Sequence, residues 1–206
     1  METLTISELD TTSTDPGAPA WDSVPSVTVP LVPVPIDAQP NAYIRAAWKD
    51  RGYGRTAAAS MALARSGENL LVRLSWEASG PPMGEFPDAC AVIFPQGQGP
   101  EDPGTMGSHT EPVTVWHWRD RSDVQQALPA ARHLVASGPG VFHPAADARD
   151  LAASAAFDGT RWSVVVSGPA AALAPGGRVA VAVWDGTNDE RAGIGAVSAT
   201  WTAVTA

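Results

Sequence analysis

Apolar and polar residues alternate along several short stretches of this chain, which is the period-two pattern of a half-buried β-strand. The pattern is clearest over residues 70–76, where leucine, valine and tryptophan take every second position and arginine and serine lie between them. Residues 56–65 form a similar stretch, and the Ser-Gly-Glu-Asn sequence between the two is typical of a hairpin turn. The pattern therefore predicts an antiparallel pair with one face in a core.

Further stretches of this kind recur at regular intervals along the chain. They predict strands over 43–48, 89–94, 113–118, 161–167, 178–184 and 196–204. The segments 161–167 and 178–184 flank a turn rich in proline and glycine, so we expect them to pair with each other. About eight short strands separated by such turns are typical of a sandwich. We predict a mainly β protein, an antiparallel β-sandwich with one or two short helices in a long connection.

Two connections interrupt the strand pattern. Residues 96–111 form a loop of glycine, proline and glutamate that carries Met106. Residues 122–156 begin with Ser-Asp-Val-Gln-Gln-Ala-Leu, which predicts an N-cap and a short helix. An alanine-rich stretch near 147–157 predicts a second helix. Long loops on the rim of a sandwich commonly carry function.

The beginning of the chain differs in composition from the rest. Residues 1–20 are polar and predict a flexible N-terminal arm, followed by a single domain over 21–206. Residues 21–40 hold five prolines among valines, which predicts an edge strand or an extended strap. The first residues lack the basic and apolar regions of a signal peptide, and no stretch is long enough to span a membrane. We expect a cytoplasmic protein, with export alongside a partner left open.

Composition excludes several classes of function. The net charge is −9 and Lys49 is the only lysine, so the chain lacks the basic surface of a nucleic-acid-binding protein. Cys90 is the only cysteine, which excludes an intramolecular disulfide and a thiolate metal site built from this chain alone. Cys90 lies in an apolar strand, so we expect a buried structural thiol.

Motifs for hydrolytic and phosphate chemistry are lacking. The four histidines do not have the spacing of a zinc hydrolase, no glycine-rich phosphate loop precedes a predicted helix, and no serine lies in a nucleophile elbow. Asp185 and Glu190 could form a carboxylate pair. We interpret them instead as solvated acids of a hairpin turn.

One set of motifs has a more specific meaning. Met106-Gly107 stands ahead of the strand Val-Thr-Val-Trp-His-Trp, which ends at Trp118. The other motifs are Phe86-Pro-Asp-Ala89, Phe94-Pro95, Val179 to Gly186, Asp189-Glu190, Ala196-Val-Ser198 and Trp201. Together they resemble the haem-b (gamma) subunit of type II DMSO-reductase-family molybdoenzymes, such as the ethylbenzene, dimethyl sulfide, selenate and chlorate enzymes. The resemblance covers roughly residues 21–206.

The resemblance implies an electron-transfer subunit that carries one b-type haem. Such a subunit exchanges electrons with an iron–sulfur subunit, while a molybdopterin catalytic subunit carries out the substrate chemistry. Met106 matches the methionine that supplies one axial ligand to the haem iron. A second Met-Gly pair, Met83-Gly84, precedes Phe86-Pro-Asp88 and matches that position less well. Trp116 and His117, on the strand after Met106, are expected at the haem site.

The second iron ligand is open. The family's lysine, in a Gly-Gly-x-Lys-x-Val-Ser context, falls on Gly195 in this chain. The candidates to replace it are His117, His143 and Lys49. His109 stands only three residues after Met106, and His133 lies on the predicted helix. The alternatives are a five-coordinate iron and a chain that has lost the haem.

Two other functions are compatible with the sequence. One is a haem-free structural subunit of the same type of complex. The other is a carbohydrate-binding-like sandwich module, since 8 tryptophans could stack on sugar rings. Most of these tryptophans occupy alternating strand positions, which favours a role in the core. Absorbance in the Soret region separates the haem subunit from both alternatives.

Overall fold

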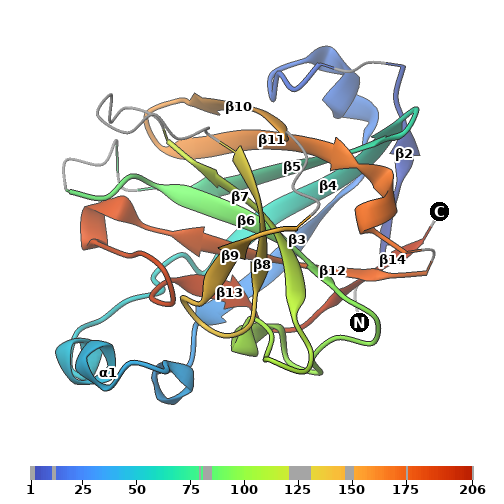
Figure 1. The fold of residues 1–206 in the computed structure, drawn as a ribbon. Helices are drawn as coiled ribbons and strands as arrows, with labels where there is room; N and C mark the ends of the chain where they lie inside the picture. The colour runs from blue at the N-terminus through green and yellow to red at the C-terminus, as the bar shows by residue number, and fades with distance from the viewer. Residues whose placement is uncertain are drawn as a thin grey trace.

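The computed structural model of the chain describes residues 3–10, 13–78, 80, 85–120, 131–146, 151–174 and 176–205. In these residues fourteen strands form one sheet that curls over itself into two layers (Figure 1). In chain order the strands are β1 Thr3–Thr5, β2 Ser7–Glu8, β3 Ser26–Pro33, β4 Ala58–Ser66, β5 Asn69–Glu77, β6 Ala89–Pro95, β7 Val113–Arg119, β8 Ala131–Ala136, β9 Phe142–Pro144, β10 Ala152–Phe157, β11 Arg161–Pro169, β12 Arg178–Trp184, β13 Ala196–Ser198 and β14 Thr202–Thr205. The helical elements are α1 Ala42–Trp48 and the 3-10 turns η1 Pro19–Ser23, η2 Ile36–Ala38, η3 Pro103–Thr105, η4 Ala170–Ala172 and η5 Gly186–Asn188.

The expected antiparallel β-sandwich is confirmed. The strands follow one another in the order β10-β11-β5-β4-β3-β13-β12-β6-β7-β8-β9. Strand β3 joins the two layers, because residues 26–30 pair with β4 and residues 31–33 pair with β13. The layer before β3 in this order is called the first layer here, and the layer after it the second layer.

The core between the layers follows the alternation that the sequence displays. The β4–β5 hairpin pairs Ser66 with Asn69, as expected, and the alternate positions Leu70, Val72, Leu74 and Trp76 all face the inner core. Cys90 is fully buried among them on β6, so the expected structural thiol is confirmed. Burial raises the pKa of the Cys90 thiol, which keeps it protonated and unreactive.

The sequence suggests an edge strand or strap for the proline-rich segment, and the edge strand is wrong. The segment is β3, which has a neighbour on each side. The ladder passes from β4 to β13 at Pro30, so the missing amide hydrogen falls where the strand changes partners. The carbonyl of Pro30 accepts a hydrogen bond from Ala199 at 3.0 Å.

The predicted strand over 43–48 is wrong, because these residues form the helix α1. The side chain of Asn41 caps this helix by accepting a hydrogen bond from the Tyr43 amide at 2.9 Å. Ile44, Ala47 and Trp48 have the i, i+3, i+4 spacing of a helix face, and Trp48 is buried. The helical spacing and the cap therefore prevail over the β propensity of the aromatic and branched residues.

The expected pairing of 161–167 with 178–184 is also wrong. Strand β11 lies between β10 and β5 in the first layer, whereas β12 pairs with β6, β13 and β14 in the second. The connection between them, which includes η4, carries the chain from one layer to the other. The predicted strand 196–204 is interrupted before Trp201 and forms β13 and β14.

The long connection after β7 contains strands where it is described. Residues 152–157 form β10, so the predicted helix near 147–157 is wrong for this part, and His133 lies on β8 and not on a helix. The predicted helix after Ser122, residues 147–150 and the Met83-Gly84 pair lie outside the described residues. The small side chains of β10 pair along all six positions with β11, which explains a strand in an alanine-rich sequence.

The described residues of the segment 1–20, which the sequence predicts as a flexible arm, are attached to the sheet. Strand β1 pairs in parallel with β14, and β2 pairs in parallel with β4. Leu4 is 1% exposed and belongs to the inner core. Within the described part of the chain, no helix has the length and apolar character needed to cross a membrane.

Candidate functional site

A second apolar surface covers the outside of the second layer and is called the outer face here. It is formed by Ala89, Ala91, Ile93, Val113, Val115, Leu134, Ala136, Ala180, Ala182, Trp184 and Val197. Val34, Met106 and Trp201 pack onto it from adjoining segments. The outer face is distinct from the inner core, because successive residues of each strand point to opposite sides of the sheet.

Met106 is held at one end of the outer face by a fixed backbone. It follows η3, whose N-cap Asp102 accepts a hydrogen bond from Gly104 at 2.7 Å, and it adopts a left-handed conformation with φ 50°. Its amide donates to the Pro103 carbonyl at 2.9 Å, and its carbonyl accepts from Gly138 at 3.2 Å. Gly107 has φ 85°, and a Cβ there would lie 2.7 Å from the carbonyl oxygen of Ala136. The Met-Gly pair is therefore fitted to the ends of β7 and β8.

The Met106 side chain is fully buried on the outer face. Although Met106 lies in the polar loop over 96–111, its side chain packs in a cluster with valine, leucine, isoleucine and tryptophan side chains. A buried thioether can fill a gap in a core, and it is also a soft ligand for haem iron.

His117 lies on the same face, further along β7. Its register places it beside Ala91 on β6 and Arg132 on β8, and its ring meets the Trp184 ring edge-on with centroids 5.4 Å apart. Its Nδ1 atom is enclosed and has no hydrogen-bond partner in the part of the chain that the structure describes. Burial, with smaller contributions from Arg132 and Arg119, lowers the pKa of His117 to about 3. The imidazole is therefore neutral at physiological pH and able to ligate a metal.

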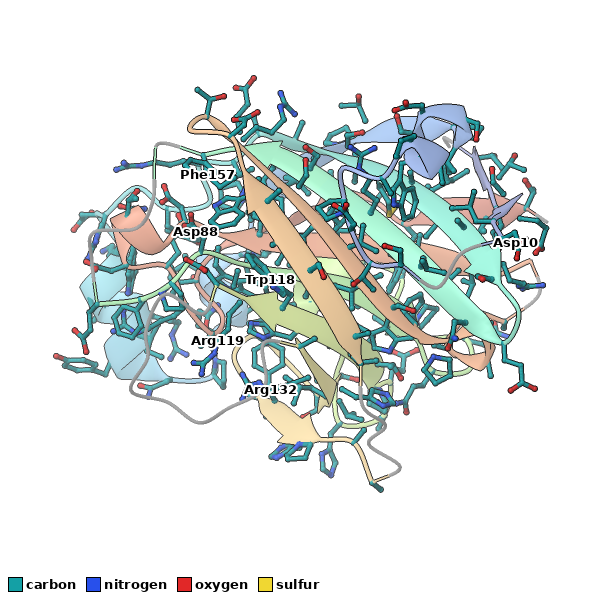
Figure 2. All side chains as sticks on the ribbon, turned by 90° about the horizontal axis from the view of Figure 1, so that it is seen from above. Asp10, Asp88, Trp118, Arg119, Arg132 and Phe157 are labelled. Atoms are coloured by element: carbon teal, nitrogen blue, oxygen red, sulfur yellow. The ribbon has the colours of Figure 1, made fainter. Side chains whose placement is uncertain are left out.

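Two arginines surround His117. Arg132 is its cross-strand neighbour, and Arg119 is two residues further along β7. Burial lowers the pKa of Arg132, and the nearby Arg119 lowers it further. Figure 2 shows the two arginines on neighbouring strands at the same end of the second layer. The two guanidinium groups therefore lie near enough to influence each other beside His117.

The position of the family's lysine is taken by Gly195, and the ring of Trp184 fills the space that a side chain there would need. A Cβ at Gly195 would lie 2.7 Å from Cδ1 and 2.9 Å from Nε1 of Trp184. The indole is fixed there, because its Nε1 donates to the Ala192 carbonyl at 2.9 Å. The turn η3, which directly precedes Met106, lies against β13, which directly follows Gly195.

The remaining candidates lie elsewhere. Trp116 points into the inner core, where its ring meets Phe94 at 4.8 Å, on the other side of β7 from the outer face. His143 is exposed on β9, at the edge of the second layer, and Lys49 is exposed at the end of α1. His133 pairs with Trp116 in the register, so it points to the opposite side of β8 from Arg132.

Sequence inspection missed Arg132 and Trp184 as neighbours of His117. They are distant in the chain and come together only through the β6–β7–β8 and β6–β12 registers. A weak signal was available: Arg132 stands in an otherwise apolar alternation with Leu134 and Ala136, where a charged side chain needs a partner.

The sequence led us to expect that both acids after β12, Asp185 and Glu190, are solvated. This is wrong for Glu190. Glu190 is 1% exposed, and its carboxylate accepts hydrogen bonds from the Gly54 amide at 2.7 Å, the Asp185 amide at 3.0 Å and the Asn188 side chain at 3.0 Å. Burial nevertheless raises the pKa of Glu190 above its ordinary value of 4.5. The carboxylate ties η5 to the loop before β4, which is a structural role.

We expect Glu190→Gln to change the pH dependence of stability. Because the folded-state pKa of Glu190 is raised, its contribution to stability is complete below 4.5 and is lost as the pH rises through the folded-state pKa. Between about pH 4 and pH 7, the free energy of unfolding measured with urea should decline less steeply with pH in Glu190→Gln than in wild type. The variant should also be less stable by about 1–3 kcal/mol, because its amide cannot make all the hydrogen bonds of the carboxylate. The exposed Glu101→Gln is the control. An unchanged slope in Glu190→Gln would contradict the role of this carboxylate.

The chain is similar in sequence to several known proteins. A protein of Haloferax mediterranei named as a respiratory nitrate reductase haem subunit is 34% identical over 202 residues, 89% of this chain and 65% of its own length. The gamma subunit of chlorate reductase from Ideonella dechloratans is 32% identical over 66% of this chain and 60% of its own length. The gamma subunit of dimethylsulfide dehydrogenase from Rhodovulum sulfidophilum is 28% identical over 92% of this chain and 74% of its own length.

The chain is a homologue of these haem and gamma subunits. The resemblance to haem-b (gamma) subunits that the motifs indicate is thereby confirmed. The chain spans less than two thirds of the length of the first two relatives.

No family model matches the chain. Among solved structures, a family 9 carbohydrate-binding module from Caldicellulosiruptor kristjanssonii in complex with glucose covers 99% of this chain and 95% of its own, with 9% identity and a TM-score of 0.48. The same type of module in complex with cellotriose gives a TM-score of 0.47 with 11% identity, covering 99% of this chain and 93% of its own.

Proposed function

We propose that this gamma-subunit homologue is an electron-transfer subunit that carries one b-type haem in an oxidoreductase complex. The observation that carries the proposal is the placement of Met106: a thioether sulfur, fully buried in an apolar surface, on a backbone fixed by η3 and Gly107. The relatives named as haem and gamma subunits support it.

The residues of the outer face fit a haem group. The apolar side chains around Met106 suit a porphyrin ring, and the neutral imidazole of His117 lies on the same face with an enclosed nitrogen that lacks a hydrogen-bond partner. Arg132 adds positive charge at one end of this face, which would suit a propionate group. When bound, the haem supplies a one-electron redox centre.

The chain's own residues would set the properties of that centre. The Met106 sulfur would hold the haem iron and, as a thioether, would favour the ferrous state and raise the reduction potential. The valine, leucine and alanine side chains of the outer face exclude water and lower the local dielectric. The hydrogen bonds to the Met106 backbone hold the sulfur in place, so that little reorganisation is needed when an electron moves.

We further propose that the partners are an iron–sulfur subunit and a molybdopterin catalytic subunit. The basis is the relatives' names, which include a gamma subunit of a chlorate reductase and of a dimethylsulfide dehydrogenase. A subunit that carries electrons through one haem would exchange them with a neighbouring protein.

Titration of the full chain with ferric haem b tests the proposed function. We expect a saturable Soret band at one haem per chain, and a reduced spectrum with sharp α and β bands. Buffer alone and an unrelated folded β-sandwich protein that does not bind haem serve as blanks for non-specific haem adsorption. Haem that associates only as a broad, unsaturable band would contradict the proposal.

A further inference from the structure

We propose that Arg178 and Trp201 are positioning residues for Met106, because they hold the loop that carries it and thereby keep the thioether sulfur on the outer face. This inference rests on the proposed function, in which the sulfur binds the haem iron. The bond between sulfur and iron, and with it the reduction potential, would then depend on two residues from distant parts of the chain. Three sets of contacts carry the inference.

The first set joins the guanidinium group of Arg178 to the start of the loop. Arg178 is the first residue of β12, and its Nη2 atom lies 2.5 Å, 3.5 Å and 3.0 Å from the carbonyl oxygens of Gln98, Gly99 and Pro100. The chain turns tightly here: Gly99 has φ 60°, and a Cβ at this position would lie 2.3 Å from the Cβ of Pro95. Charge-assisted hydrogen bonds are about twice as strong as neutral ones, so Arg178 fixes this turn firmly.

The second set joins the same turn to the outer face through Trp201. The indole Nε1 donates a hydrogen bond at 2.9 Å to the Pro100 carbonyl, the oxygen that Arg178 also contacts. The guanidinium carbon of Arg178 lies 4.8 Å from the centre of the Trp201 ring, which is a cation–π distance. Trp201 is buried and belongs to the same apolar cluster as Met106. The indole therefore connects the anchored turn to the surface on which the thioether lies.

The third set carries the anchoring from Pro100 along the loop to Met106. The Asp102 carboxylate accepts a hydrogen bond from the Gly104 amide at 2.7 Å, and the Met106 amide donates to the Pro103 carbonyl at 2.9 Å. Met106 itself is left-handed, with φ 50°. A non-glycine residue keeps this unfavourable conformation only where its surroundings impose it. The backbone that directs the sulfur onto the outer face therefore depends on the fixed turn before it.

Loss of either contact to Pro100 has two separate consequences for Met106. The loop should open more often, since local opening is easiest where few interactions hold a segment. While the loop is open, the sulfur is away from the outer face and cannot bind iron there. The sulfur is also accessible to oxidants during that time, whether or not haem is present. The second consequence can be measured without the cofactor.

The first measurement uses the haem-free full chain and dilute hydrogen peroxide, which transfers one oxygen atom to a thioether sulfur and leaves water. Peptide mass spectrometry gives the rate of sulfoxide formation at Met106. Arg178→Gln and Trp201→Phe should each raise this rate about tenfold, the effect of one lost hydrogen bond on the opening equilibrium. Met61, fully buried in the inner core, is the internal control and should keep its rate.

The second measurement is the reduction potential of the full chain loaded with haem b. Arg178→Gln and Trp201→Phe should lower the potential toward that of Met106→Leu, a variant without the thioether. Arg178→Lys keeps the positive charge and should restore part of the wild-type potential. Arg161→Gln is the matched control, because Arg161 is also the first residue of a strand, β11, and forms an exposed ion pair with Glu77 at 3.3 Å. This control should leave the potential unchanged.

Wild-type oxidation rates and potentials in both Arg178→Gln and Trp201→Phe, with unchanged circular dichroism, would overturn this inference and leave haem binding intact. Faster oxidation of Met106 without a fall in potential would also overturn it, because the two residues would then protect the sulfur without affecting a bond to iron. A wild-type chain without a Soret band would overturn the proposed function and the control of the potential with it. In that case, the oxidation rates still decide whether Arg178 and Trp201 hold Met106 in place.

Discussion

Replacement of Met106 by leucine should leave the fold intact and lower the reduction potential of the bound haem. Leucine has nearly the volume of methionine, so the outer face remains filled and the cost in stability should be less than about 1.5 kcal/mol. The thioether is lost, and with it the ligand that favours ferrous iron. Axial ligands set haem potentials over a range of about 0.8 V, so we expect a fall on the order of 0.1 V in a spectroelectrochemical titration.

Met61→Leu is the matched control for this prediction. Met61 is also fully buried, but it lies in the inner core on β4, away from the outer face. The same exchange there should leave the potential and the reduced spectrum unchanged. If Met106→Leu binds haem with the wild-type spectrum and potential, Met106 is a packing residue and not a ligand.

Gly195→Ala should be costly although it adds a single methyl group. The new Cβ would lie 2.7 Å from Trp184 Cδ1, and the indole cannot move without loss of its hydrogen bond to Ala192. Overpacking of this kind costs about 1–3 kcal/mol. Because Trp184 contacts the ring of His117, the substitution should also broaden the haem spectrum or change its spin state. Urea unfolding and the ferric spectrum measure the two effects.

Gly52→Ala is the control for the second prediction. A Cβ at Gly52 would have its nearest neighbour at 3.8 Å, the Nη2 atom of Arg55, so alanine fits without a clash. Stability equal to wild type in Gly195→Ala would mean that Trp184 is free to move. The position of the family's lysine would then be open to a side chain.

The fold could be predicted where the sequence pattern is regular. The alternation over 70–76 identified the inner face of β5, and the apolar run around Cys90 identified a strand with a buried thiol. The pattern failed at 43–48, where the short helix capped by Asn41 forms instead of a strand. The predicted pairing of β11 with β12 was also wrong, because β11 pairs with β5. A turn rich in proline and glycine does not reveal whether the chain returns to the same layer or crosses to the other.

The candidate site could be predicted only in part, for a similar reason. Met106 carries a local signal, the Met-Gly pair before a strand. The surroundings of His117 depend on register: Arg132 and Trp184 reach it from β8 and β12, and no local sequence pattern specifies such long-range pairing. The absence of a ligand at Gly195 was visible in the sequence, whereas the ring that occupies its place was not.

The most direct test of the account is the haem content of the protein purified from its native source without added haem. A pyridine haemochrome spectrum distinguishes b-type haem from covalently attached haem and gives the ratio of haem to chain. The account predicts one b-type haem per chain, with a Soret band that shifts on reduction. A natively purified protein with no haem, or with haem bound at far below one per chain, would contradict the assignment of an electron-transfer subunit.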